Sequence, residues 1–139
     1  MKVLVAGATG AVGRRLTPRL VAAGHEVAGL VRSPEKAEAL RRAGVQPTVV
    51  DAFDRSAVRS AVLEARPEVV VDEMTALQNA SDLVHFDRAF VVTNRLRTEA
   101  LDHLLGAAEE SGARRFVAQS FCGWPYARTG GPVKTEEDP

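Results

Sequence analysis

Three glycines, spaced three residues apart, follow an apolar run near the start of the chain and constrain its fold more than any other feature. The run covers residues 3–6, and the glycines are Gly7, Gly10 and Gly13. Glycine lets the backbone turn sharply after a strand, and it lets an anion approach backbone N–H groups without meeting a Cβ atom. A helix that begins at the turn adds the positive end of its dipole. The pattern therefore predicts a strand, a turn and a helix, with a nucleotide phosphate bound at the turn.

The rest of the chain continues as an alternation of strands and helices. Short apolar runs predict strands at residues 3–6, 26–31, 45–50, 69–71 and 115–119. Helical spacing and end signals predict four helices: from the glycine turn to Gly24, from Pro34 to Gly44, from Asp54 to Pro67, and over about residues 86–110 up to Gly112. Such alternation implies a parallel sheet with right-handed crossovers and helices on both faces. The sequence predicts a doubly wound, Rossmann-type α/β fold in three α/β/α layers.

Composition excludes several classes of partner and site. The 139 residues suit one domain, and 18 basic residues against 18 acidic ones create no field that would attract nucleic acid or an anionic membrane. No apolar run approaches the roughly 20 residues that a membrane helix needs, so a cytoplasmic location is expected. Cys122 is the single cysteine, and the three histidines lie far apart, so no metal site is expected. The partner expected is a small-molecule substrate.

With these elements in place, the chain resembles the extended or atypical branch of the short-chain dehydrogenase/reductase superfamily, which includes NAD-dependent epimerases and dehydratases. The resemblance covers nearly the whole chain. It rests on residues 7–13, on Asp51 after the third strand, and on residues 100–116, which look like the helix leading into the family's fifth strand. It implies that residues 1–128 form a Rossmann domain for NAD(H) or NADP(H), that residues 129–139 are a flexible acidic tail, and that the family's C-terminal substrate region is absent.

The candidate cofactor contacts follow the ends of the first three strands, because ligands bind at the carboxyl ends of parallel strands in this class of fold. They are Gly7, Thr9, Gly10, Ala11, Val12, Gly13 and Arg14 after the first strand, Arg32 and Ser33 after the second, and Asp51 and Ala52 after the third. Arg14 either holds a phosphate or is a solvated residue in the first helical turn.

The residues that follow the second strand indicate whether the chain binds NAD(H) or NADP(H). NAD enzymes place an acid there, which would repel a 2′-phosphate. Arg32 can instead meet that phosphate with two hydrogen bonds, Ser33 can donate another, and Lys36 lies near by. NADP(H) is therefore favoured, and NAD(H) stays open. By resemblance, Asp51 accepts a hydrogen bond from the adenine amino group.

The residues expected to carry out the reaction depart from the family pattern. The family's proton donor is the tyrosine of a Tyr-x-x-x-Lys motif, whereas Tyr126 is followed four residues later by Gly130. The family's catalytic Ser or Thr aligns with Phe121, which leaves Ser120, one residue earlier, as the candidate catalytic residue. Asp72 and Glu73 follow the fourth strand, where the family has small or apolar residues along the nicotinamide ribose. Because adjacent side chains of extended backbone point to opposite faces, we interpret the two carboxylates as part of a polar loop.

Two functions are open at this point. The resemblance implies the NAD(P)-binding part of an oxidoreductase, or of a nucleotide-sugar-type epimerase or dehydratase, working by hydride transfer. The alternative is a non-catalytic dinucleotide-sensing or protein-interaction module, which the missing Tyr-x-x-x-Lys motif fits. A homodimer through the long helix is also open, because that helix carries a broad apolar stripe: Leu96, Leu101, Leu104, Leu105 and Ala108.

Overall fold

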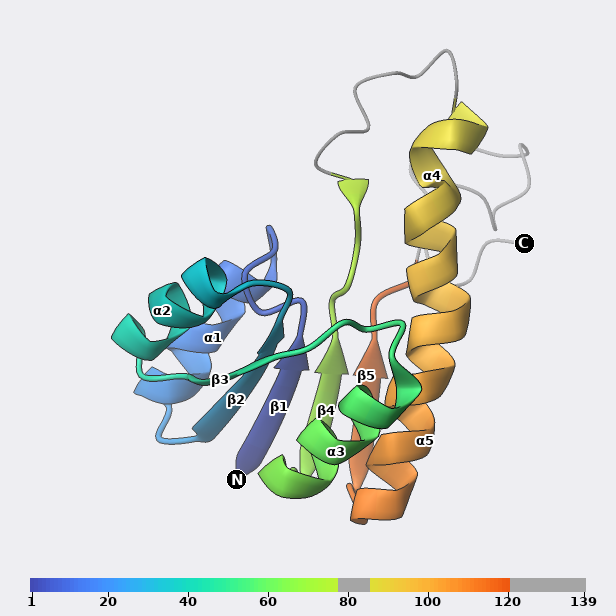
Figure 1. Cartoon of the computed structure of the whole chain (residues 1–139). Coiled ribbons are helices and arrows are strands. Elements are labelled where there is room, and N and C mark those ends of the chain that lie inside the picture. Colours follow the sequence, from blue (N-terminus) through green and yellow to red (C-terminus); the bar gives the residue numbers. More distant parts are fainter. Residues whose placement is uncertain (78–85, 121–139) are drawn as a thin grey trace, which may run out of the picture.

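A five-stranded, all-parallel sheet forms the centre of the molecule (Figure 1). The computed structural model describes residues 1–77 and 86–120. The strands run in the order β3-β2-β1-β4-β5. Their bounds are β1 Lys2–Ala6, β2 Glu26–Val31, β3 Gln46–Val49, β4 Val69–Asp72 and β5 Arg115–Ala118. The predicted Rossmann-type fold is confirmed. The sequence predicted the third strand at residues 45–50. In the structure, β3 covers Gln46–Val49 only, and Val45 and Val50 are buried directly before and after it.

Helices cover both faces of the sheet, as the crossover rule requires. On one side lie α1 (Gly13–Ala22) and α2 (Pro34–Arg42) (Figure 1). On the other lie α3 (Arg55–Ala65) and a long helix made of α4 (Phe86–Arg95), a π-helical turn η2 (Leu96–Ala100) and α5 (Leu101–Ser111). The predicted helix over residues 86–110 is thus confirmed in position.

Local signals account for where these helices begin and end. Asp54 precedes α3, and its Oδ1 accepts a hydrogen bond from the Ala57 N–H at 3.0 Å, which satisfies a free donor of the first turn. Gly112 ends α5 with a φ of 77°, a left-handed conformation that costs glycine little. Both signals were readable in the sequence, and both predicted ends are correct.

The π-helical turn was not predicted. Such turns arise where one extra residue is accommodated within an α-helix, and they occur often at functional sites. Within it, the Thr98 hydroxyl donates to the Asn94 carbonyl at 3.0 Å. The turn matters here because its first residue, Leu96, faces the pocket described below.

Two apolar clusters hold the layers together, one on each face of the sheet. Toward α1 and α2, the buried members are Val3, Val5, Ala8, Val27, Val31, Ala37, Leu40 and Val45. Toward α3 and α5, they include Leu4, Leu30, Val58, Val62, Val70 and Leu104. Alternate residues of β1 contribute to opposite clusters, as the period of two of a strand dictates. Leu4 and Val5 are fully buried, so β1 is the centre of the core and fixes where its following turn lies.

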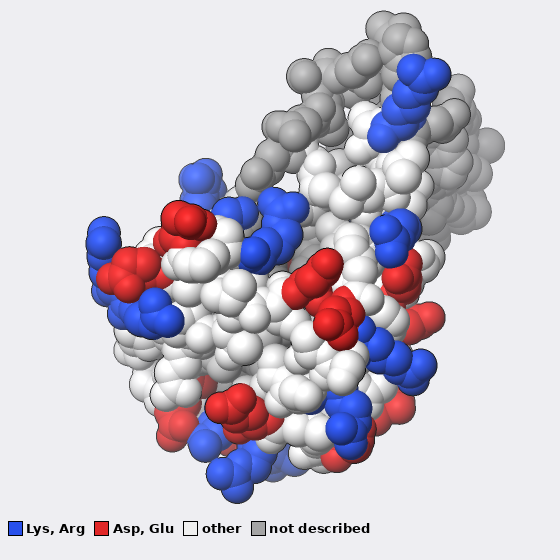
Figure 2. All heavy atoms as spheres, in the orientation of Figure 1, with Lys and Arg blue, Asp and Glu red and all other residues white. Residues whose placement is uncertain are grey.

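The surface carries charges of both signs. On the face drawn in Figure 2, basic and acidic side chains are interspersed, and no large area carries one sign. Within the described residues, no helix combines the length and the apolar character that crossing a membrane requires.

Candidate functional site

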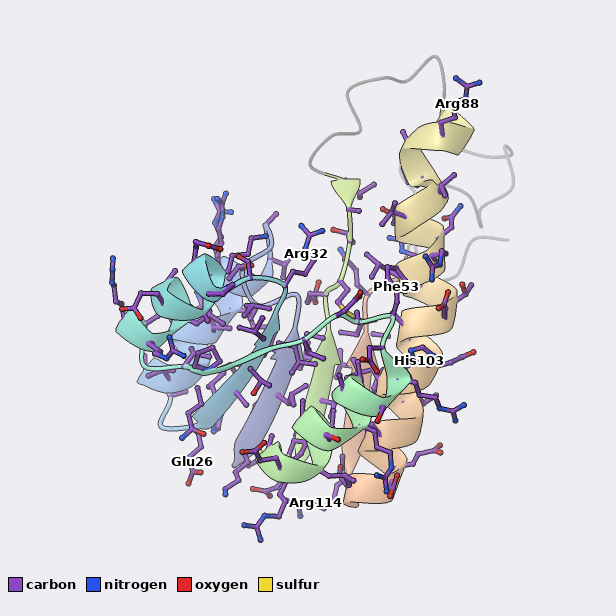
Figure 3. The ribbon with its side chains drawn as sticks, in the orientation of Figure 1. Glu26, Arg32, Phe53, Arg88, His103 and Arg114 are labelled. Atoms are coloured by element: carbon purple, nitrogen blue, oxygen red, sulfur yellow. The ribbon has the colours of Figure 1, made fainter. Side chains whose placement is uncertain are left out.

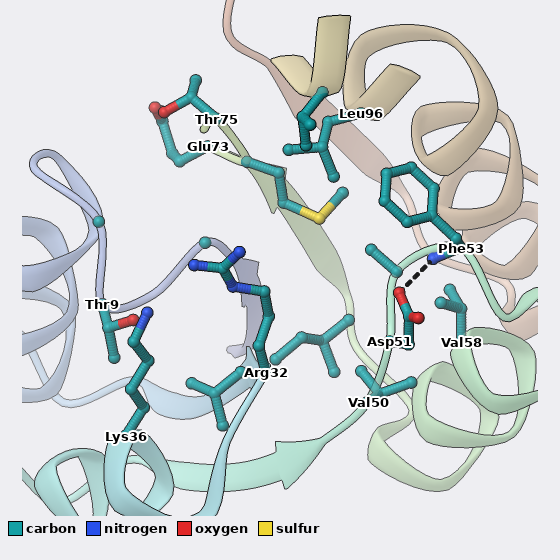
Figure 4. A pocket seen from close by; sticks show the side chains of 17 residues that line it. Thr9, Arg32, Lys36, Val50, Asp51, Phe53, Val58, Glu73, Thr75 and Leu96 are labelled. Carbon is teal, nitrogen blue, oxygen red and sulfur yellow. Dashed lines mark hydrogen bonds between the residues drawn. The ribbon is translucent and has the colours of Figure 1, made fainter. Parts of the chain in front are cut away.

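A pocket opens at the carboxyl ends of β1 to β4, bounded on the far side by α4 and the π-helical turn (Figure 4). Parallel strands end at this edge, and the chain diverges there into loops that leave space between them. The lining residues are Gly7, Thr9, Gly10, Leu30, Val31, Arg32, Lys36, Val50, Asp51, Ala52, Phe53, Val58, Glu73, Met74, Thr75, Val92 and Leu96. This set joins the segments that follow β1, β2, β3 and β4, which are four of the five strand ends that the sequence analysis singled out.

The glycine turn forms one side of the pocket, and its three glycines have different roles. A Cβ atom at Gly7 would lie 2.5 Å from the Glu73 carbonyl oxygen, and one at Gly13 would lie 2.7 Å from the Ala8 Cα. Those two positions are closed by the protein itself. A Cβ at Gly10 would lie 3.1 Å from the Gly7 carbonyl oxygen and at an ordinary contact distance of 3.9 Å from the Glu73 carbonyl oxygen. The Gly10 N–H closes the turn by donating to the same Gly7 oxygen. Gly10 is therefore the glycine that leaves room for a ligand.

The other predicted contacts of this turn fall in three places. Thr9 and Gly10 line the pocket. Ala11 and Val12 are exposed in the turn before α1, outside the lining set, and Gly13 is buried at the start of the helix. Arg14 follows in the first turn of α1 and is exposed. The sequence-based assignment of Ala11, Val12, Gly13 and Arg14 as cofactor contacts stays a prediction.

A positive end of the pocket is built by the chain that leaves β2. Arg32 is the first residue after the strand, and Lys36 is on the first turn of α2. Both side chains line the pocket, on the side where Thr9 also lies (Figure 4). Ser33 lies outside the lining set, and its side chain is hydrogen-bonded to Glu35, which lowers the pKa of that carboxyl. The cofactor contact predicted for Ser33 stays a prediction.

The loop after β3 forms the opposite wall. Asp51 Oδ1 accepts a hydrogen bond from the Phe53 N–H at 3.0 Å, and a His103 ring nitrogen on α5 bonds the Ala52 carbonyl at 3.2 Å. The Arg95 guanidinium lies 3.9 Å from the centre of the Phe53 ring, a cation–π contact. These contacts fix the loop between the sheet and the long helix (Figure 3). Phe53 thus presents a rigid apolar surface to the pocket.

The end of β4 and the loop that follows it supply the third wall and two partly buried carboxylates, Asp72 as the last residue of the strand and Glu73 as the first after it. Asp72 is 6% exposed, and its Oδ1 accepts from the Met74 N–H at 3.0 Å. Burial raises the pKa of Asp72, and Glu73 repels its charge while Arg97 attracts it. Burial also raises the pKa of Glu73, which lines the pocket. The interpretation of both residues as a polar loop is therefore incomplete, because neither carboxylate is fully solvated.

Sequence reasoning missed several lining residues. Phe53, Glu73, Val92 and Leu96 were not assigned to the site. Phe53 stands two residues after Asp51, so its loop position was a usable signal. Val92 and Leu96 carry no local signal, since their place depends on how the long helix crosses the sheet edge.

The residues that the sequence analysis considered for catalysis after the fifth strand are not among those that line the pocket. Ser120 is exposed two residues after β5 and does not line the pocket. Cys122, Tyr126 and the segment 129–139 lie outside the described residues. Among the described residues, no three His, Cys, Asp or Glu side chains are placed to hold a metal ion.

The site residues fit a dinucleotide. The glycine turn leaves its one open position toward the pocket, the segment after β2 is positive, and apolar side chains from the loop after β3 and from the long helix form a wall. Helix α1 begins directly after the turn, so its N–H groups favour an anion there.

Comparison with known proteins agrees with this geometry. Residues 7–137 match the family described as NAD(P)H-binding. A 3-diazoavenalumate denitrifying reductase from a Streptomyces species is 49% identical over all 139 residues, which cover 43% of that protein. The chain thus spans less than half the length of this curated relative.

Solved structures show the same fold. A UDP-glucose-4-epimerase from Stenotrophomonas maltophila matches with a TM-score of 0.77 at 20% identity, over 96% of this chain and 40% of that one. The Bordetella bronchiseptica enzyme WbmG, solved in complex with NAD, matches with a TM-score of 0.65 at 24% identity, over 85% of this chain and 36% of that one. The chain therefore belongs to the NAD(P)H-binding family, and it shares its Rossmann-type fold with these enzymes of known structure.

Proposed function

We propose that this domain binds NADPH in preference to NADH, and that it is the cofactor-binding part of a reductase. The observation that carries the cofactor preference is the positive end of the pocket. Arg32 occupies the place after β2 where an acid would select NADH, and Lys36 lines the same pocket. A 2′-phosphate would gain charge-assisted hydrogen bonds from both side chains.

The availability of these two cations supports the same choice. Within residues 1–77 and 86–120, neither Arg32 nor Lys36 has an ion-pair partner, whereas other basic residues, such as Arg59 with Glu110 and Arg95 with Glu99, are paired. An unpaired guanidinium loses no internal contact when a phosphate approaches it. The two cations are thus free to serve a ligand.

The reductase assignment rests on the 49% identity to a denitrifying reductase along the entire chain. The epimerases share the fold at much lower identity. When bound, a nicotinamide supplies the hydride for such a reduction. The residues of this domain would hold and orient the dinucleotide, and the apolar wall of Phe53, Val92 and Leu96 would keep water from part of it. Ser120 remains the candidate catalytic residue.

Calorimetric titration of the purified chain with NADPH and with NADH tests the cofactor preference. We expect tighter binding of NADPH. Arg32→Ala should weaken NADPH by about 2 kcal/mol, roughly thirtyfold in Kd, because one charge-assisted contact is lost. NADH binding should change little. Lys36→Ala should act in the same direction.

Arg19→Ala is the matched control, since Arg19 is an exposed arginine on α1 outside the pocket. It should leave both affinities unchanged. Equal affinity of the wild-type chain for the two nucleotides, with no effect of Arg32→Ala, would refute the preference. Binding of neither nucleotide to a folded chain would refute the proposed function and favour the alternative of a protein-interaction module.

A further inference from the structure

Glu73 carries a carboxylate to the same edge of the pocket as the glycine turn. The pairing of β1 with β4 sets Ala6 opposite Asp72, and the Glu73 N–H donates to the Ala6 carbonyl at 3.0 Å. Glu73 therefore stands beside Gly7, whose missing Cβ would lie 2.5 Å from the Glu73 carbonyl oxygen. Its backbone is part of the cradle.

One oxygen of this carboxylate lacks a partner. Glu73 Oε2 is buried and has no hydrogen bond among the described residues, although Glu73 lines the pocket. Burial raises the pKa of Glu73, and within the described residues its carboxylate forms no ion pair with a basic side chain. A buried acceptor without a donor is unfavourable, and such groups occur where a ligand supplies the donor.

The loop that holds Glu73 is fixed on both sides. The Met74 N–H donates to Asp72 Oδ1 at 3.0 Å, and the Ala76 N–H donates to the Thr93 hydroxyl at 3.1 Å. Thr93 is fully buried on α4. The backbone on either side of Glu73 is thus fixed before any ligand arrives, so only the side chain of Glu73 has to be ordered for a contact to it, which lowers the entropic cost of that contact.

Strand order indicates which part of a dinucleotide would reach Glu73. The sheet runs β2, β1, β4 in space. If the 2′-phosphate lies at the end of β2 and the pyrophosphate at the glycine turn after β1, the next group along the ligand reaches the end of β4. That group is the ribose that bears the nicotinamide.

The chemistry of this ribose matches the unpartnered carboxylate. A carboxylate without a nearby cation repels phosphate but accepts hydrogen bonds from neutral hydroxyl groups. A ribose diol offers two such donors, and an acidic residue commonly binds ribose hydroxyls in this class of fold. We infer that Glu73 accepts hydrogen bonds from the hydroxyl groups of the nicotinamide ribose. The inference rests on the proposed NADPH binding and adds a residue that orients the nicotinamide half.

Two ligands separate this contact from the rest of the site. NADPH contains the nicotinamide ribose, whereas adenosine 2′,5′-bisphosphate contains the 2′-phosphate and adenosine but no second ribose. Calorimetric titration of Glu73→Gln should show NADPH bound about tenfold more weakly than by the wild-type chain, because a charged acceptor is lost. Binding of the bisphosphate should be unchanged.

Glu64→Gln, an exposed acid on α3, is the matched control and should alter neither affinity. Thermal unfolding would check that both variants fold. Glu73→Asp keeps the charge but shortens the side chain, and it gives a second test. It should also weaken the binding of NADPH and leave that of the bisphosphate unchanged. Unchanged or tighter NADPH binding by Glu73→Gln, with the bisphosphate still bound, would overturn the ribose contact and leave the proposed function intact. Loss of the bisphosphate as well would assign Glu73 to the turn rather than to the ribose, and would equally overturn it. Failure of the wild-type chain to bind either ligand would overturn the proposed function.

Discussion

At the scale of single residues, one motif combines a structural demand with a binding role. Gly7 and Gly13 are enclosed by backbone atoms, so their lack of a Cβ is needed for the turn to exist. Gly10 lines the pocket and has only one close backbone neighbour. Glycine is therefore required at Gly7 and Gly13 for the turn to form and at Gly10 to leave space for a ligand. Mutations can separate these two requirements.

Gly13→Ala should destabilise the fold, whereas Gly10→Ala should chiefly impair binding. The first places a methyl group 2.7 Å from the Ala8 Cα, and forcing an atom into closed backbone costs about 3 kcal/mol. The second needs a small shift at the Gly7 carbonyl and puts its methyl group where a pyrophosphate would approach. Urea unfolding measures the first effect, and titration with NADPH measures the second.

Gly106→Ala provides the control, because a Cβ at Gly106 meets no atom within 4 Å. It lies within α5, where alanine is favoured by up to about 1 kcal/mol over glycine. The distinction between the two motif glycines would be wrong if Gly10→Ala bound NADPH as the wild type does.

Asp72 links stability to pH. Its native pKa is raised by burial, so between the ordinary value and the raised value the native state binds more protons than the unfolded state. The free energy of unfolding contributed by this group therefore falls as pH rises through that window. The Arg97 charge offsets part of the effect.

Asp72→Asn should remove this dependence while its amide oxygen still accepts from the Met74 N–H. The free energy of unfolding of the variant relative to wild type should rise as the pH increases through the window. Urea unfolding at a series of pH values measures this difference. A constant difference across the series would contradict a raised pKa for Asp72.

At the scale of elements, the sequence predicted most of the scaffold, and six of the predicted cofactor contacts are among the 17 residues that line the pocket. Strand runs and end signals such as Asp54 and Gly112 act locally, so they were readable from neighbouring residues. The pocket wall formed by Val92 and Leu96 was not, because it depends on where the long helix crosses the sheet. The π-helical turn likewise follows from tertiary packing rather than from a residue preference.

Asp54 allows a test of such a local signal. Asp54→Ala removes the acceptor of the Ala57 N–H and should lower the free energy of unfolding by about 1 kcal/mol. Asp54→Asn keeps an oxygen at the cap and should be close to wild type. Denaturant unfolding compares the three chains, and an equal loss in both variants would mean that charge rather than capping stabilises α3.

At the scale of the whole molecule, most of the apolar side chains on the long helix that suggested a homodimer are buried or half-buried within one chain. Leu104 and Ala108 are buried in the core, and Leu96 and Leu101 are half-buried. Leu105 is left 38% exposed, and Val91 on the preceding turns is 55% exposed. Val92 is 46% exposed as well and also lines the pocket, so a contact between two copies through the described part of the long helix would use Leu105, Val91 and Val92.

If two chains associate through this helix, the dimer should depend on Leu105. Light scattering coupled to chromatography should then give the mass of two chains for the wild type at high concentration and of one chain for Leu105→Glu, because a charge would have to be buried at the contact. Val49→Glu is the matched control. Val49 is 48% exposed on β3, at the opposite edge of the sheet, so this variant should associate as the wild type does. If the wild-type chain has the mass of one copy even at high concentration, the apolar residues of the long helix serve the packing of the single chain and no dimer forms through them.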